Sequence, residues 1–373
     1  MQGLYIHIPF CKKACHYCDF HFSTSLAHKA PLVEALAAEI RLQKSYLPSP
    51  TLDTIYFGGG TPSLLEQEDL KKILEAVYQN FELSKTAEIT LEANPDDVNK
   101  ETVSMWKGSG INRLSIGIQS FFEEDLAWMN RAHNAEQAAN CIDIALQSGI
   151  ENITADLIYG YPQLSDTKWT KNIETMLSTG INHLSAYSLT VEPKTALAHK
   201  IKKGEPAPQS NQAARHFEML MDAIAAAGWE HYEISNYCKP GNYAKHNTNY
   251  WKNQPYLGIG PSAHSYDTRK RTWNVSNNAS YITSINAGTI PNEEELLSTD
   301  DLFNEYVMTG LRTQWGINTQ YVEEKWGGSY VKHIVSEAES YIKNGQLIYS
   351  SNNLTLSREG KLLADYIASE LFI

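Results

Sequence analysis

The sequence predicts an α/β protein made of parallel strands and covering helices, followed by a smaller C-terminal unit. Six apolar runs of strand length recur, at residues 4–8, 53–58, 87–94, 113–120, 153–160 and 183–192. The runs are almost continuously apolar, which is typical of parallel strands that are covered on both faces. Segments of helical period separate them, so right-handed βα crossovers are expected. A complete or partial (β/α) barrel and a doubly wound open sheet both satisfy this pattern.

Helices are predicted where apolar residues repeat at helical spacing. Residues 29–46 place Leu, Leu and Ile four positions apart, and residues 209–228 carry a similar stripe. Ser210 is a candidate N-cap of the second helix, and Gly228 is placed to end it. Polar residues and glycines follow most of the strands, at the edge where barrels and open sheets alike carry their functional groups.

The regular alternation stops near residue 229, and this change suggests three parts. We predict a βα unit over 1–230 and a loop-rich extension, dense in Gly, Pro, Asn and aromatic residues, over 231–295. Residues 296–373 show helical patterns and a hairpin that turns near Asn352 and Asn353, which predicts a small winged-helix-like α+β domain.

Charge and composition exclude several classes of protein. The formal net charge is −12, and no Lys/Arg-rich block is present, so binding to nucleic acid is not expected. There is no signal-peptide pattern and no apolar stretch of membrane-spanning length. The five cysteines do not form a disulfide framework typical of secreted proteins, and we expect a cytoplasmic protein.

Three of the cysteines, Cys11, Cys15 and Cys18, form a C-x3-C-x2-C pattern directly after the first strand. Thiolates select zinc, copper(I) or iron–sulfur clusters. A zinc site would need His16 or His21 as a fourth ligand. Alternatively, the three thiolates would hold three corners of a [4Fe-4S] cluster and leave one iron open to a small molecule such as S-adenosylmethionine (SAM).

The cysteine pattern resembles the radical SAM signature, and the resemblance extends over nearly the whole chain. The segments "YFGGGTPSLL", "LEANP", "IGIQSF", "NRAH" and "DLIYGYP" follow in order. This order is similar to that of oxygen-independent coproporphyrinogen III dehydrogenases (HemN) and the related HemW-type heme chaperones. The resemblance implies a partial (β/α)6 TIM-like radical SAM barrel, a [4Fe-4S] cluster held by the three cysteines, and bound SAM.

The resemblance also implies which residues contact SAM. Tyr5 matches an aromatic residue beside the cluster-bound SAM, and the Gly59-Gly60-Thr61 loop matches the backbone that approaches the SAM amino group. The other implied SAM-contacting positions are Glu92, Gln119, Arg131, Asp156 and Ile158. No residue is assigned a catalytic role.

Two positions distinguish the enzyme from the chaperone within this family. Phe20 stands where HemN-type enzymes carry a further cysteine, and "KHNTNYW" matches the HNxxYW motif of HemW-type proteins. The resemblance therefore favours a protein that binds heme through His246, Tyr250 and Trp251 and passes it to an unidentified acceptor. A membrane-associated acceptor and a homodimer are further expectations. The alternative is a radical SAM enzyme, either a coproporphyrinogen III dehydrogenase or one with another substrate.

Overall fold

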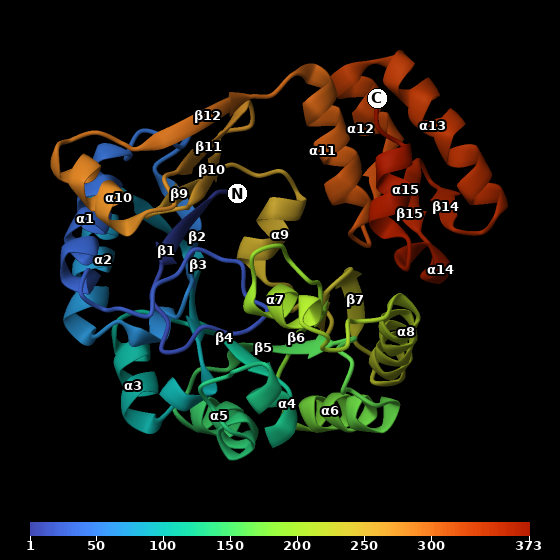
Figure 1. Cartoon of the computed structure of the whole chain (residues 1–373). Helices are drawn as coiled ribbons and strands as arrows, with labels where there is room; N and C mark the ends of the chain where they lie inside the picture. The colour runs from blue at the N-terminus through green and yellow to red at the C-terminus, as the bar shows by residue number, and fades with distance from the viewer.

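The computed structural model describes residues 1–373, and its centre is a curved sheet of six parallel strands (Figure 1). The strands are β1 (Gly3–Ile8), β2 (Thr51–Gly59), β3 (Glu82–Ala93), β4 (Arg113–Gln119), β5 (Asn152–Tyr159) and β6 (His183–Ser188). All six predicted strands are thus present. Their apolar residues form the larger of two hydrophobic cores.

The helices that follow these strands cover the outside of the sheet (Figure 1). They are α1 (Lys29–Leu42), α2 (Gln67–Asn80), α3 (Lys100–Gly108), α4 (Glu123–Trp128), α5 (Ala135–Gln147), α6 (Asp166–Ser178) and α8 (Ser210–Ala226). The remaining helix of this region, α7 (Ala196–Lys202), lies instead at the carboxyl ends of the strands, where Leu197 N donates to His16 O. Gly228 follows the end of α8 with a φ of +70°, as expected. Ser210 is not the N-cap: Gln209 occupies that position, and no side chain caps the helix.

The order of the strands decides between the two predicted architectures. β1 to β6 are neighbours in sequence order, whereas a doubly wound sheet reverses its strand order at a switch point. The outermost strands of the sheet do not pair with each other. The fold is therefore a partial barrel.

Residues 231–295 are more ordered than the expected loop-rich extension, because they extend both edges of the same sheet. β7 (Glu230–Glu233) and β8 (Asn236–Cys238) lie beyond β6, and β9 (Tyr256–Ile259) pairs with β1 in parallel. Further out lie β10 (His264–Tyr266), β11 (Lys270–Asn274) and β12 (Asn292–Leu296), with α10 (Asn278–Asn286) packed beside α1. The remaining helix, α9 (Lys245–Trp251), lies between the two edges (Figure 1).

The C-terminal unit has its own hydrophobic core of 14 buried residues. Its elements are α11 (Thr299–Leu311), β13 (Ile317–Asn318), α12 (Thr319–Trp326), α13 (Gly328–Lys343), β14 (Leu347–Ser350), β15 (Asn353–Leu356), α14 (Arg358–Lys361) and α15 (Ala364–Glu370). The expected hairpin turns at Ser351 and Asn352, one residue earlier than predicted, and both residues have positive φ. None of the helices in the chain combines the length and apolar composition that crossing a bilayer requires.

Candidate functional site

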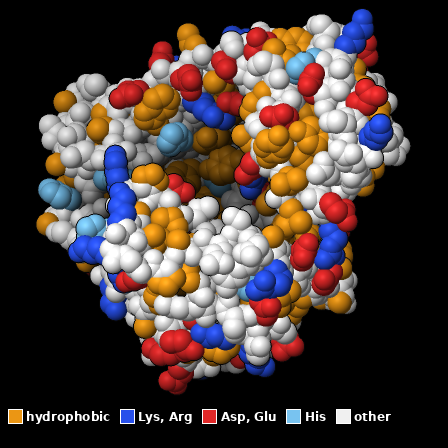
Figure 2. Space-filling model, turned by 45° about the vertical axis from the view of Figure 1, so that its right-hand side comes forward, with side chains coloured by type: hydrophobic (Ala, Val, Ile, Leu, Met, Phe, Trp, Pro, Cys, Tyr) orange, Lys and Arg blue, Asp and Glu red, His pale blue; other side chains and the backbone are white.

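A cavity of about 480 Å³ opens at the carboxyl ends of the parallel strands. This volume lies within the range of about 300–1,000 Å³ typical of small-molecule sites. Its walls come from the ends of β2 to β6 and from the cysteine loop, which we define as residues 9–28 between β1 and α1. Figure 2 shows the molecule hollowed near its centre, with hydrophobic side chains in the depth of the hollow.

The cysteine loop is held in place by backbone hydrogen bonds at its base and near its middle. Ser23 N donates to Pro9 O at 2.8 Å, and Cys11 N donates to Ser23 O at 3.0 Å, which closes the base. His16 O accepts from Leu197 N of α7 at 2.7 Å. These bonds fix the loop so that Cys11, Cys15 and Cys18 all line the cavity.

The three thiols do not form a site for a single metal ion. A zinc ion needs four donors within about 2.0–2.3 Å of one point, and no three His, Cys, Asp or Glu side chains of the chain form such a group. Of the two histidines considered as a fourth ligand, His16 Nδ1 bonds Trp128 O at 2.7 Å and His21 Nε2 bonds Asn278 Oδ1 at 2.7 Å. Three soft thiols that line one cavity of about 480 Å³ are a donor set of the kind that holds a [4Fe-4S] cluster.

Arg131 supplies positive charge beside these thiols. Its Nη1 lies 3.3 Å from both Cys15 Sγ and the Tyr17 hydroxyl, and its Nη2 donates to Asn94 Oδ1 at 2.6 Å and Gly117 O at 2.8 Å. Its Nε is buried without a hydrogen-bond partner. An unpaired donor and a fixed cation beside three thiols favour an anionic group in the cavity.

Burial keeps two of the thiols protonated when no metal is bound. It raises the pKa of Cys18 to about 11, and it also raises the pKa of Cys11. Only the thiolate is a metal ligand. Binding of a cluster must therefore release protons from these side chains.

The glycines after β2 bring backbone close to the cavity. Gly59 has a φ of +105°, and a Cβ on Gly60 would lie only 2.7 Å from the carbonyl oxygens of Ile8 and Phe10. Only residues without a Cβ fit this approach. Glu92 fixes the loop, because its carboxylate accepts from Gly59 N at 3.1 Å and from the Tyr56 hydroxyl at 2.7 Å.

Two carboxyl groups face the cavity with altered acidity. Burial raises the pKa of Glu92 to about 7 and that of Asp156 to about 6. Each carboxyl is thus poised to change its charge near neutral pH, and a cationic or hydrogen-bond-donating ligand would shift it toward the carboxylate.

Gln119 reaches the cavity from a strained backbone. Its φ is +68°, and the pairing of β4 with β5 shifts register between Ile116 and Gln119. A left-handed conformation costs a non-glycine residue about 1 kcal/mol or more. The irregularity turns the end of β4 so that Gln119 lines the cavity.

Eight of the nine residues expected to contact SAM line this one cavity together with the cysteines. They are Gly59, Gly60, Thr61, Glu92, Gln119, Arg131, Asp156 and Ile158. Tyr5 is not among the lining residues: its hydroxyl bonds His7 Nδ1 at 3.0 Å, and its ring stacks on Tyr56 at 6.2 Å. Three further residues, Asn94, Ser115 and Tyr187, line the cavity but were not predicted. Asn94 and Tyr187 lie at the carboxyl ends of β3 and β6, which was the available signal, whereas Ser115 lies within β4 and gave none.

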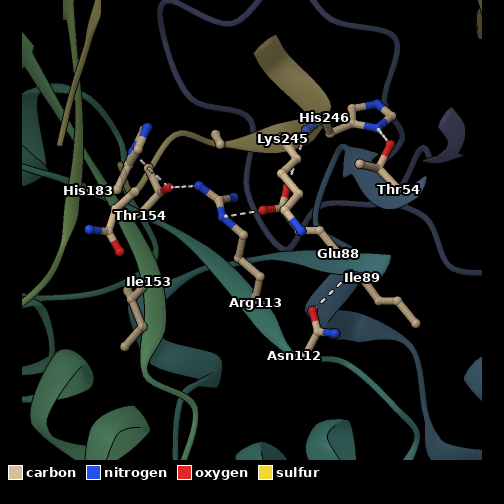
Figure 3. Close-up of polar contacts among 12 residues, drawn as sticks. Thr54, Glu88, Ile89, Asn112, Arg113, Ile153, Thr154, His183, Lys245 and His246 are labelled. Carbon is tan, nitrogen blue, oxygen red and sulfur yellow. Dashed lines mark hydrogen bonds and ion pairs between the residues drawn. The ribbon is translucent and has the colours of Figure 1, made fainter. Parts of the chain in front are cut away.

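The HNxxYW motif lies on α9 and does not line this cavity, and its histidine is buried. His246 is 2% exposed. Its Nδ1 lies 2.7 Å from Thr54 Oγ1 and its Nε2 lies 2.7 Å from the Tyr250 hydroxyl; Figure 3 shows the ring pointing at Thr54. Both ring nitrogens are therefore engaged in hydrogen bonds. The sequence predicts that His246 binds heme, but in this structure its ring does not face an open site.

His246 belongs to a buried polar network that closes the amino end of the barrel, which we call the floor. Its backbone N donates to Glu88 Oε1 at 3.2 Å, and Glu88 pairs with Arg113 at 3.6 Å (Figure 3). Arg113 donates to Thr154, which bonds His183 Nδ1 at 3.0 Å. Each of the five strands from β2 to β6 thus contributes one residue to the floor.

A partial barrel that carries three cysteines above a glycine loop defines a radical SAM protein, and the radical SAM superfamily model matches residues 5–176. In the solved structure of coproporphyrinogen III oxidase (HemN) from Escherichia coli, described as a radical SAM enzyme, the same fold recurs with a TM-score of 0.86. That likeness covers 100% of this chain and 90% of the other, at 21% sequence identity.

Among curated proteins, the chain is 36% identical to the heme chaperone HemW of Mycobacterium tuberculosis, over 99% of this chain and 94% of that protein. It is 35% identical to HemW of Bacillus subtilis, over 98% of each. It is also 30% identical to radical S-adenosyl methionine domain-containing protein 1, mitochondrial, of Mus musculus, over 97% of this chain and 85% of that protein. The chain belongs to the HemW family within the radical SAM superfamily.

Proposed function

We propose that this protein is a heme chaperone of the HemW type, which binds heme and transfers it to an acceptor protein. Its barrel would hold a [4Fe-4S] cluster on Cys11, Cys15 and Cys18, with SAM beside it. Similarity to HemW proteins over the full length of the chain carries this proposal.

The position of Phe20 supports the chaperone over the enzyme. Its side chain is 67% exposed and lines the mouth of the cavity. A thiol at this place would face any molecule entering the cavity, whereas the phenyl ring offers neither a metal ligand nor an acid. The shared fold with HemN does not favour the enzyme, because one fold hosts different functions.

The bound cluster and SAM would supply one-electron chemistry at the top of the barrel. The protein's own side chains hold the cysteine loop and the glycine loop in position. Arg131 holds Cys15 and Asn94 in place, Glu92 fixes the glycine loop, and the floor closes the other end of the barrel to water.

The test is anaerobic reconstitution with iron and sulfide, followed by hemin titration and by a coproporphyrinogen III turnover assay. We expect hemin binding, heme transfer to an apo-heme protein, and no vinyl product. Formation of vinyl product would support the dehydrogenase alternative, and the absence of hemin binding would exclude the chaperone.

A further inference from the structure

A second cavity, of about 660 Å³, lies between the barrel and the C-terminal unit. We call it the interdomain pocket. It is bounded by the end of α9 and the residues that follow it, the end of β10 with the turn to β11, the segment from α11 to α12, and the start of β15. Gly3, the first residue of β1, pairs with Tyr256 of β9, which directly follows the pocket residues 251–255. The pocket is thus at the amino end of the barrel, with the floor between it and the cluster cavity.

The lining of the interdomain pocket is unusually rich in flat aromatic rings. Five of its residues are aromatic: Trp251, Tyr266, Tyr306, Trp315 and Tyr321. Aromatic faces bind planar ligands by stacking and bury large apolar areas. Its volume is also large enough for a drug-sized cofactor, since such sites span about 300–1,000 Å³.

The charge of the pocket is opposite to that of the molecule. The protein carries a net charge of −12, yet the lining contains Lys252 and Lys325 and no Asp or Glu. Neither lysine pairs with a carboxylate. Lys252 Nζ lies 4.3 Å from the centre of the Trp315 ring, and Lys325 Nζ lies 5.5 Å from that of Tyr321. Unpaired ammonium groups beside aromatic rings favour a planar molecule that carries carboxylates.

We propose that the interdomain pocket is the heme site, with the aromatic rings contacting the porphyrin and Lys252 and Lys325 pairing with its propionates. This inference rests on the proposed function and locates it. No His, Cys or Met lines the pocket, and its tyrosines are the only lining residues of a type that commonly ligates heme iron. We therefore assign most of the binding energy to stacking on the porphyrin and to pairing with its carboxylates. A weakly ligated heme is suited to release into an acceptor.

If heme binds in the interdomain pocket, the residues of the HNxxYW motif have two different roles. His246 and Tyr250 bond each other in the floor, while Trp251, the last residue of α9, lines the pocket. His246 is then a positioning residue that fixes the helix carrying Trp251.

The experiment measures binding of hemin and of metal-free protoporphyrin IX to the full chain by absorbance and tryptophan fluorescence. We compare wild type, the double variant Lys252→Glu/Lys325→Glu, and Tyr321→Ala. A control of equal charge change is Lys332→Glu/Lys343→Glu, at exposed positions of α13. Circular dichroism checks that each variant folds.

The pocket double variant should bind both porphyrins at least tenfold more weakly, Tyr321→Ala several-fold more weakly, and the control within twofold of wild type. Hemin and protoporphyrin IX should bind wild type with affinities within about tenfold of each other.

Two outcomes would overturn the proposal and are distinguishable from failure of the proposed function. If wild type binds hemin but the pocket variants bind it equally well, heme lies elsewhere and the chaperone function stands. If protoporphyrin IX binds a hundredfold more weakly than hemin, iron ligation dominates the affinity and the proposed binding by stacking and carboxylate pairing is wrong. If wild type binds no hemin, the chaperone function itself fails.

Discussion

Single residues set the dimensions of the cluster cavity. Gly60 lies against the carbonyl oxygens of Ile8 and Phe10, so the loop after β2 and the start of the cysteine loop are in van der Waals contact. Glu92 links this loop to Tyr56 on the inside of the barrel. A small change in side-chain size at Gly60 or Glu92 should therefore shift the position of the cysteine loop.

Gly60→Ala should destabilise the protein and impair cluster assembly. The new Cβ would lie 2.7 Å from two backbone carbonyl oxygens, which cannot rotate away, and such overpacking costs about 1–3 kcal/mol. Thermal unfolding and the yield of the 400-nm cluster absorbance measure the effect. Gly108→Ala is the control, because nothing lies within 4 Å of its Cβ; equal behaviour of the two variants would contradict the steric argument.

SAM affinity should rise between pH 6 and pH 8. Burial raises the pKa of Glu92 to about 7, so its carboxyl is mainly protonated at pH 6 and mainly ionised at pH 8. The carboxylate accepts hydrogen bonds from SAM better than the acid does. Calorimetry on the reconstituted protein measures the trend, and Glu92→Gln should bind SAM more weakly with a flatter pH profile. A wild-type affinity that does not change with pH would argue against contact between Glu92 and SAM.

At the scale of elements, the short helix α9 depends on its contacts for stability. With seven residues, it is too short to be stable alone. The floor provides those contacts: Lys245 Nζ donates to Thr86 O at 2.7 Å, and His246 bonds residues of β2 and β3. The helix in turn closes the gap between the two edges of the sheet (Figure 1).

His246→Ala should lower stability without removing an iron ligand. It leaves the Thr54 and Tyr250 hydroxyls without this partner in a buried place, at a cost of about 2–4 kcal/mol. Chemical denaturation measures the loss, and His264→Ala, at an exposed position, should change stability by less than about 0.5 kcal/mol. Where the His246 variant is folded, its hemin spectrum should match that of wild type. An altered iron spectrum would instead identify His246 as a ligand.

At the scale of the whole molecule, the barrel and the C-terminal unit are joined by paired backbone and a buried charge. Ile234 N donates to Arg312 O at 3.0 Å, and Gln314 N donates to Tyr232 O at 2.9 Å. Glu233, whose side chain is fully buried, pairs with Arg312 at 3.3 Å. This junction sets the width of the interdomain pocket, because Thr313 and Trp315 on the same segment line it.

The protein should lose stability as pH falls from 7.5 to 5.5. Burial lowers the pKa of His7 and His133 to about 4 and that of His231 and His246 to about 3, and it lowers that of His183 well below its usual value. Below the unfolded-state pKa of about 6.5, the unfolded chain binds protons at these sites and the folded chain does not. The stabilisation is therefore complete above pH 6.5 and is lost as pH falls.

Glu92 and Asp156 act in the opposite sense, because a raised carboxyl pKa favours the folded state at low pH, and they reduce the slope. Burial also raises the pKa of Glu39, Glu233 and Glu305, which adds to this opposing effect, and it lowers the pKa of His216 and His264 in the same direction as that of the other five histidines. Seven histidines therefore act against five carboxyls, and we expect a net drop of a few degrees in the melting temperature between pH 7.5 and 5.5. A constant or rising melting temperature over this range would contradict the burial of the histidines.

Local patterns in the sequence were enough to predict much of this molecule. The six parallel strands were predictable because apolar runs followed by polar strand ends are local signals, and their order then brings Glu92, Gln119 and Asp156 to one edge. The three cysteines lie within eight residues, so their common role was visible as well. The roles of the individual SAM-contacting residues came from the family resemblance and not from residue type alone.

The tertiary structure decided what depends on contacts between distant residues. Thr54 and His246 are 192 positions apart, and no local signal shows that their side chains meet in the floor. Tyr5 turns to His7 instead of the cavity, and residues 231–295 divide between the two edges of one sheet. The interdomain pocket is assembled from four separate stretches of chain. Burial and hydrogen bonding at such places are set by the packing of whole elements, which a sequence specifies only through its fold.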